Sequence, residues 1–181
     1  MRALAQCVSA LDPDVLALSE VDAGDALAVA TRFDRQWAYR GGQAVLWNRR
    51  FVAVKVHDLY LPATPLAPFE RRGLLRVDGR CDSTELTLFA ARFAPARACV
   101  RDLRFTRSAI RASGAARIVL FLTDPPGAGR ASFGDLGLRP ECADAAAADL
   151  MLAVRGCSVQ SCIVARAENG IGAQLIARVT A

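Results

Sequence analysis

Apolar residues in this chain gather in short runs whose spacing separates strands from helices. Residues 15–21 are an almost continuous apolar run of strand length, which predicts a strand buried on both faces. Residues 52–56 alternate valine with other side chains, as a half-exposed strand would. Residues 97–113 instead repeat their apolar positions every three or four residues, which predicts an amphipathic helix.

The same patterns predict helices and strands along the whole chain. Strands 74–77 and 86–91 should pair as a hairpin across Asp78-Gly79-Arg80. The mixed order favours two packed sheets flanked by helices, in one α+β domain over residues 1–181. The helices are expected at 2–11, 26–33, 97–113 and 143–150, and the strands at 15–21, 43–47, 52–56, 74–77, 86–91, 118–122, 151–154, 161–165 and 174–179.

Composition narrows the class of protein. Hydrophobic residues make up 53% of the chain, yet no apolar run reaches the roughly 20 residues of a membrane helix. No basic segment followed by an apolar one marks a secretory signal. Six cysteines without a Cys-x-x-Cys pair, and a single histidine, argue against a zinc site. We therefore expect a cytoplasmic protein with reduced, buried thiols and no membrane partner.

Charge leaves two interpretations open. The net charge is +5, and Lys55 is the only lysine among 23 basic residues. Arginines at 97, 101, 104, 107 and 111 form a stripe on the predicted helix, with Val100, Leu103 and Ile110 pointing inward. The stripe is either a solvated face or a contact surface for the phosphates of nucleic acid or another polyanion.

Two acids stand at the ends of buried strands. Glu20 follows the run that begins at residue 15, and Asp124 follows the run at 118–122. Sites in open α/β sheets gather beyond the carboxyl ends of strands. Glu20 could therefore bind a metal, or it could simply pair with an arginine. Asp124 could belong to the same site, or only to its Asp-Pro-Pro-Gly turn. His57, on an alternating strand, is expected to face solvent or to bond locally.

Several stretches resemble the endonuclease/exonuclease/phosphatase superfamily, whose members are metal-dependent phosphoesterases. Asp-Pro-Asp-Val-Leu-Ala-Leu-Ser-Glu-Val at 12–21 is similar to its second strand; further similarities lie at 41–49, 86–92, 118–126, 149–152 and 174–179. The resemblance implies a four-layer α/β/β/α sandwich with two mixed sheets. It also implies hydrolysis of a phosphodiester or phosphomonoester with Mg²⁺ or Mn²⁺ bound through Glu20. Asp124 would be catalytic, and Arg92 and Arg101 would contact phosphate.

The chain departs from the family pattern at most catalytic positions. The resemblance begins at the helix after the family's first strand, so we expect that strand, with its metal-side Asn, to be absent. Arg92 stands where the family has a His, Pro126 replaces an Asn, and residues 170–173 replace Ser-Asp-His. These departures predict weak or no hydrolysis. The alternatives are a non-catalytic module that binds phosphate, nucleic acid or a protein, and a reading frame whose start lies upstream.

The absence of the first strand also predicts a physical property. Two neighbouring strands should lose their ladder partners, and such exposed edges invite pairing with another chain. We therefore expect self-association.

Overall fold

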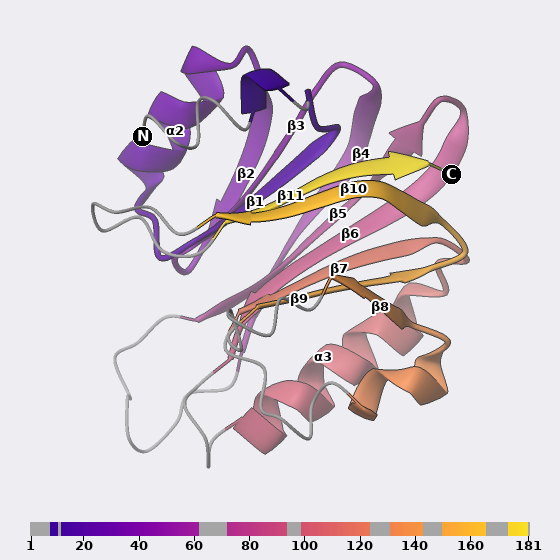
Figure 1. Cartoon of the computed structure of the whole chain (residues 1–181). Helices are drawn as coiled ribbons and strands as arrows, with labels where there is room; N and C mark the ends of the chain where they lie inside the picture. Colours follow the sequence, from indigo (N-terminus) through magenta and orange to yellow (C-terminus); the bar gives the residue numbers. More distant parts are fainter. Residues whose placement is uncertain are drawn as a thin grey trace.

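Two β-sheets packed face to face form the centre of the molecule (Figure 1). The computed structural model describes residues 8–10, 12–61, 72–93, 99–123, 131–142, 150–165 and 174–180. The five-stranded sheet has the order β10-β11-β1-β3-β2, and the six-stranded sheet has the order β4-β5-β6-β7-β9-β8. The elements are β1 (Val15–Ser19), α2 (Ala23–Arg32), β2 (Gln36–Arg40), β3 (Gln43–Trp47), β4 (Phe51–Tyr60), β5 (Gly73–Cys81), β6 (Thr84–Arg92), α3 (Cys99–Ser113), β7 (Ile118–Thr123), η2 (Ala131–Leu136), β8 (Arg139–Cys142), β9 (Leu150–Arg155), β10 (Ser158–Ala165) and β11 (Gln174–Thr180).

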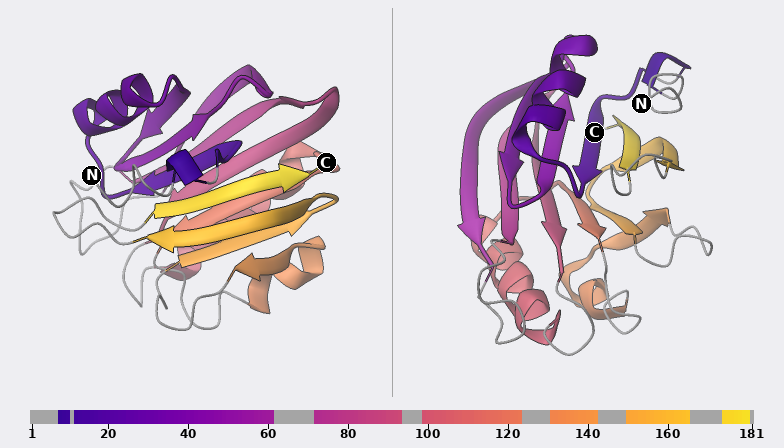
Figure 2. Two further views of the ribbon diagram at one scale, coloured as in Figure 1. Left: turned by 45° about the horizontal axis from the view of Figure 1, so that its top comes forward. Right: turned by 90° about the vertical axis from the view of Figure 1, so that its left-hand side faces the viewer.

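The helices cover the two outer faces, which gives the predicted four layers. Val29 of α2 packs with Leu18 and Leu46 on the outer face of the five-stranded sheet. Ile110 of α3 packs with Phe89 on the outer face of the six-stranded sheet. The strand axes of the two sheets are roughly aligned (Figure 2). A third cluster, which includes residues of β1, β3, β5, β6 and β7, fills the space between the sheets.

Burial follows the predicted patterns where both faces of a strand are covered. All residues of β1 and β7 are buried, as their continuous apolar runs predict. Strand β4 lies at the edge of its sheet, and Val52 and Val54 on it are exposed. The prediction for Val100 is wrong, because its side chain is 52% exposed, whereas Ile110 is fully buried.

Strand β1 has a ladder partner on each side. Val15 pairs with Trp47 of β3 and also with Ala177 of β11. The expected loss of ladder partners does not occur at this strand, because β11 lies directly against it. The five-stranded sheet is antiparallel in every described pair, so the prediction of two mixed sheets holds only for the other sheet, where β6 and β7 are parallel. Self-association through an outer strand stays a prediction.

Other predicted elements differ at their boundaries. Residues 8–10 are helical, and the rest of the predicted helix at 2–11 lies outside the described residues. Residues 143–149 of the predicted helix at 143–150 also lie outside the described residues. Its last residue, Leu150, begins strand β9 and is not helical. Strands β2 and β8 and the short helix η2 were not predicted from the sequence. No described helix has both the length and the apolar character needed to cross a bilayer.

Two thiols are enclosed between the sheets. Cys81 and Cys157 are free and buried, as expected, and burial raises the pKa of both thiols. A raised pKa lowers the thiolate fraction, and the thiolate is the reactive form. The cytoplasmic location stays a prediction.

We expect both thiols to react with Ellman's reagent at pH 8 at least about tenfold more slowly in the folded protein than in denaturant. Alkylation followed by peptide mapping would follow Cys81 and Cys157 separately from the other cysteines. Equal rates in the folded and the unfolded protein would contradict the burial.

Candidate functional site

The turn after β1 holds Glu20 in an uncommon backbone conformation. Glu20 has φ of 58°, in the left-handed region that non-glycine residues seldom adopt. Hydrogen bonds of the two neighbouring residues hold this conformation in place. The side chain of Gln43 donates to the Ser19 hydroxyl at 2.7 Å, and the Val21 amide donates to the Gly42 carbonyl at 3.3 Å. The carboxylate therefore leaves the strand end in a defined direction.

Arg92 meets this carboxylate from the other sheet. Its Nη2 lies 2.8 Å from Oε1 of Glu20, and the two side chains are 32% and 46% exposed. Arg92 ends β6 in parallel register with Thr123, the last residue of β7. The ends of β1, β6 and β7 thus converge at one end of the sandwich, which we call the site end (left in Figure 1).

Strand alternation shows which side chains face the space between the sheets at the site end. Ala90 belongs to the cluster between the sheets and Ala91 to the outer cluster, so Arg92 faces inward again. By the same alternation Thr123 faces inward on β7 and Gly73 on β5. Arg92, Thr123 and Glu20 therefore lie at the mouth of the inter-sheet space, where Arg92 and Glu20 are open to solvent and Thr123 is buried.

A second pair of side chains lies at the same mouth. The guanidinium carbon of Arg40 is 3.7 Å from the centre of the Tyr60 ring. Asp58 holds this guanidinium from the side, with Nη1 and Oδ2 3.7 Å apart. Tyr60 pairs with Gly73 of β5, which is level with Arg92 because Leu74 pairs with Ala91. Sequence reasoning missed Arg40 and Tyr60. No signal in the sequence marked Tyr60 as exposed, because strict alternation puts it on the same face as the valines of β4.

The other predicted residues lie outside this group or beyond the described structure. Asp124 lies outside the described residues, directly after Thr123. Arg101 is exposed on α3, which covers the outer face of the six-stranded sheet. Part of the arginine stripe is structural, because Arg107 and Arg111 both pair with Asp135 of η2.

His57 bonds locally, as expected, and lies on the outer face of its sheet. Its Nε2 is 2.8 Å from Oδ2 of Asp78. Burial alone would raise the pKa of Asp78, but hydrogen bonds from Arg76, Thr87 and His57 hold this pKa below its usual value. The imidazole is therefore part of a side-chain network away from the site end.

Comparison with known proteins agrees with this architecture. The model of the Endonuclease/Exonuclease/phosphatase family matches residues 1–80. An endonuclease/exonuclease/phosphatase family protein from Bacteroides thetaiotaomicron superposes with a TM-score of 0.74 at 14% identity, over 99% of this chain and 88% of that one. The first 80 residues thus match the family's sequence model, and the whole chain shares the fold of this family protein. A search of curated proteins finds no match.

Other solved structures of the superfamily's fold are equally distant in sequence. TDP2 from D. rerio, complexed with a single-strand DNA product, has a TM-score of 0.73 at 11% identity, over 99% of this chain and 91% of that one. The human Nocturnin catalytic domain with bound sulfate has a TM-score of 0.69 at 12% identity, over 98% of this chain and 84% of that one. At these identities the likeness shows the fold alone.

The described residues do not fit the divalent metal that the superfamily implies. Among them, no group of three or more His, Cys, Asp or Glu side chains could hold a metal ion. Glu20, the predicted ligand, is already neutralised by Arg92. Mg²⁺ commonly binds through one or two carboxylates with waters and substrate phosphates, and a guanidinium beside the carboxylate repels such a cation.

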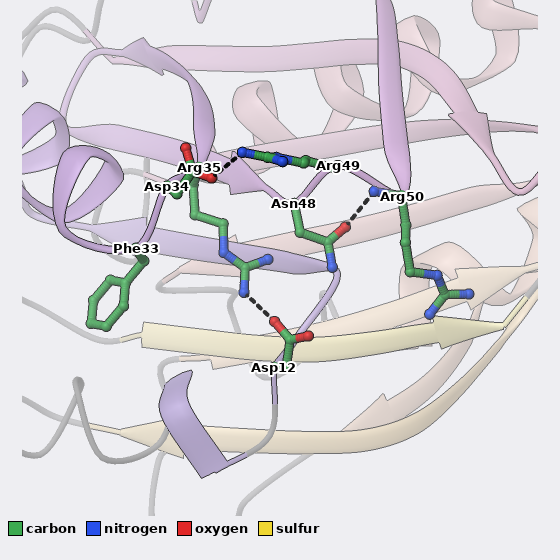
Figure 3. A pocket seen from close by; sticks show the side chains of 7 residues that line it. All are labelled: Asp12, Phe33, Asp34, Arg35, Asn48, Arg49 and Arg50. Atoms are coloured by element: carbon green, nitrogen blue, oxygen red, sulfur yellow. Dashed lines mark hydrogen bonds and ion pairs between the residues drawn. The ribbon is translucent and has the colours of Figure 1, made fainter.

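A hollow of about 300 Å³ lies at the opposite end of the sandwich, beside the start of β1 (Figure 3). Its charged side chains pair with one another or with nearby acids. Arg35 binds Asp12 at 2.8 Å, and Arg49 binds Asp34 at 2.6 Å. Arg50 binds the buried Asp14 at 3.1 Å. This balanced network fastens loops together and offers no excess charge to a ligand.

Proposed function

We propose that this chain is a degenerate phosphoesterase that binds a phosphate-containing ligand at the site end and hydrolyses it weakly or not at all. The observation that carries the proposal is the ion pair between Glu20 and Arg92. It puts a cation of the chain itself beside the acid that the family pattern assigns to the metal.

A guanidinium can replace one part of the metal's role but not the other. Its planar array of N–H donors suits a phosphate and can form charge-assisted hydrogen bonds with it. It is not a Lewis acid and does not lower the pKa of a bound water, which is how a metal generates a nucleophile. The described site therefore favours binding over turnover.

The first test is the binding of ribose 5-phosphate by calorimetry in the presence of EDTA. We expect Arg92→Gln to weaken binding roughly tenfold to a hundredfold, because a charge-assisted hydrogen bond is lost. Glu20→Gln should strengthen binding, because the carboxylate competes with the ligand for Arg92. Arg49→Gln, an exposed arginine at the opposite end, is the matched control and should leave the affinity unchanged.

A metal-dependent hydrolase is the competing function, supported by the family fold and by the position of Glu20. It predicts that Mg²⁺ or Mn²⁺ raises the melting temperature and supports turnover of bis(p-nitrophenyl) phosphate, and that Glu20→Gln abolishes both effects. Our proposal predicts neither effect in the unmodified protein. Metal-dependent turnover lost in Glu20→Gln would overturn it.

A further inference from the structure

The ring of Tyr60 is exposed to solvent at the same end of the sandwich as Glu20 and Arg92. Tyr60 is 56% exposed although it is a large aromatic residue at the end of a strand. Arg40 lies over the ring at 3.7 Å, close enough for a cation–π interaction. Since the guanidinium covers one side of the ring, the exposed area belongs to the remainder of the side chain.

The arrangement is held in place before any ligand arrives. A Cβ added to Gly73 would lie 2.3 Å from Cγ of Arg40, so the absence of a side chain at this position makes room for the arginine. Asp58, which lies on the same strand as Tyr60, forms an ion pair with the guanidinium of Arg40. A preorganised surface of this kind binds with little loss of side-chain entropy.

Tyr60 and Arg92 are spaced across three adjacent strands. Tyr60 pairs with Gly73, and Gly73 is level with Arg92, so the strands β4, β5 and β6 set their separation. Neighbouring strands lie about 4.8 Å apart, which puts the two Cα atoms about 10 Å from each other. Both side chains face inward and their tips can approach further. A ligand with a phosphate at one end and a flat ring at the other fits this span.

We infer that Arg40 and Tyr60 form a stacking platform for a nucleobase, so that the ligand of the site is a nucleoside phosphate. The inference rests on the proposed phosphate site at Arg92. Bases stack on aromatic side chains and on arginine, and proteins that bind single-stranded nucleic acid combine such platforms with basic groups along the backbone. A phosphorylated sugar without a base would gain nothing from Tyr60. The nucleoside phosphate could be a free nucleotide or a unit of a single strand.

The test compares three probes by calorimetry in EDTA: ribose 5-phosphate, AMP and a single-stranded tetrathymidylate. We expect AMP to bind about tenfold more tightly than ribose 5-phosphate, because only AMP can stack. Tyr60→Ala should remove this preference and leave ribose 5-phosphate unchanged, whereas Tyr60→Phe should keep the preference. Arg92→Gln should weaken both ligands by the same factor. Val56→Ala, 45% exposed on the same strand, is the matched control.

Each outcome separates the platform from the phosphate site. Equal affinities of AMP and ribose 5-phosphate, both sensitive to Arg92→Gln, would overturn the platform and leave the proposed function intact. A preference for AMP that depends on Tyr60 but not on Arg92 would support the platform and overturn the phosphate site. No binding of AMP at millimolar concentration would overturn both. Tighter binding of tetrathymidylate than of AMP would identify the single strand as the source of the ligand. The reverse order would identify the free nucleotide, and both orders support the platform.

Discussion

Asp102→Ala is expected to lower the free energy of unfolding by about 3–5 kcal/mol, because it leaves a buried guanidinium without its carboxylate. Asp102 in α3 is fully buried and forms an ion pair with Arg72, whose side chain is 2% exposed. The carbonyl of Arg72 also accepts a hydrogen bond from the amide of Leu61, at the end of β4. The pair therefore joins α3 to the strands that carry Tyr60 and Gly73. Urea denaturation would measure the loss, and the melting temperature should fall by roughly 10 °C.

Two further variants show whether burial causes this loss. Asp135→Ala removes a carboxylate that also binds α3 but is 48% exposed, and it should cost less than about 1 kcal/mol. The double variant Arg72→Met, Asp102→Leu removes both buried charges and should recover most of the stability. A cost for Asp102→Ala no larger than that for Asp135→Ala would contradict the explanation.

Gly79→Ala is expected to lower the free energy of unfolding by about 3 kcal/mol, the upper end of the usual range for overpacking a core. A Cβ at Gly79 would lie 2.5 Å from Cζ of Phe51 and 2.5 Å from the carbonyl oxygen of Val52. The Phe51 ring is 1% exposed and packs edge-on against Trp47, so it has little room to move. The backbone oxygen can move only if β4 moves with it. Chemical denaturation would measure the effect.

Gly134→Ala is the matched control, because a Cβ added there meets no atom within 4 Å. It should change stability by no more than about 0.5 kcal/mol. Adding Phe51→Leu to Gly79→Ala should cost less than the sum of the two single changes, since the smaller side chain relieves part of the clash. Additive costs would show that the ring is not the obstacle.

The sequence predicted the fold well where a strand is buried on both faces. The runs that became β1 and β7 stand out because every residue in them except the last is apolar. The pairing of β5 with β6 was predicted correctly, but its turn was not: Asp78, Gly79 and Arg80 lie within β5, and the chain turns at Asp82 and Ser83. Strand β2 was missed because it is half exposed, with Ala38 facing one core and Trp37 and Tyr39 the other. With only five residues, three of them apolar in a row, its alternation is too short to stand out.

The candidate site could be predicted only in part. Glu20 was recognisable as an acid at a strand end, and pairing with an arginine was one of its two interpretations. That its partner is Arg92 depends on how the two sheets pack, which local patterns do not encode. The same holds for Arg40 and Tyr60, which come from different sheets and meet only at the mouth between them. The roles of Asp124 and Arg101 stay predictions.

The pairing of β1 with β11 has a consequence for protein synthesis. Val15 emerges from the ribosome early, but its partner Ala177 emerges only when almost all the described chain has been made. The hairpins on either side of β5 can form as they appear, because their partners are close in sequence. One edge of β1 therefore stays unpaired and exposed until β11 has been synthesised. The five-stranded sheet is therefore completed after translation has passed residue 180, and nascent chains stalled before that point should be the ones that chaperones hold.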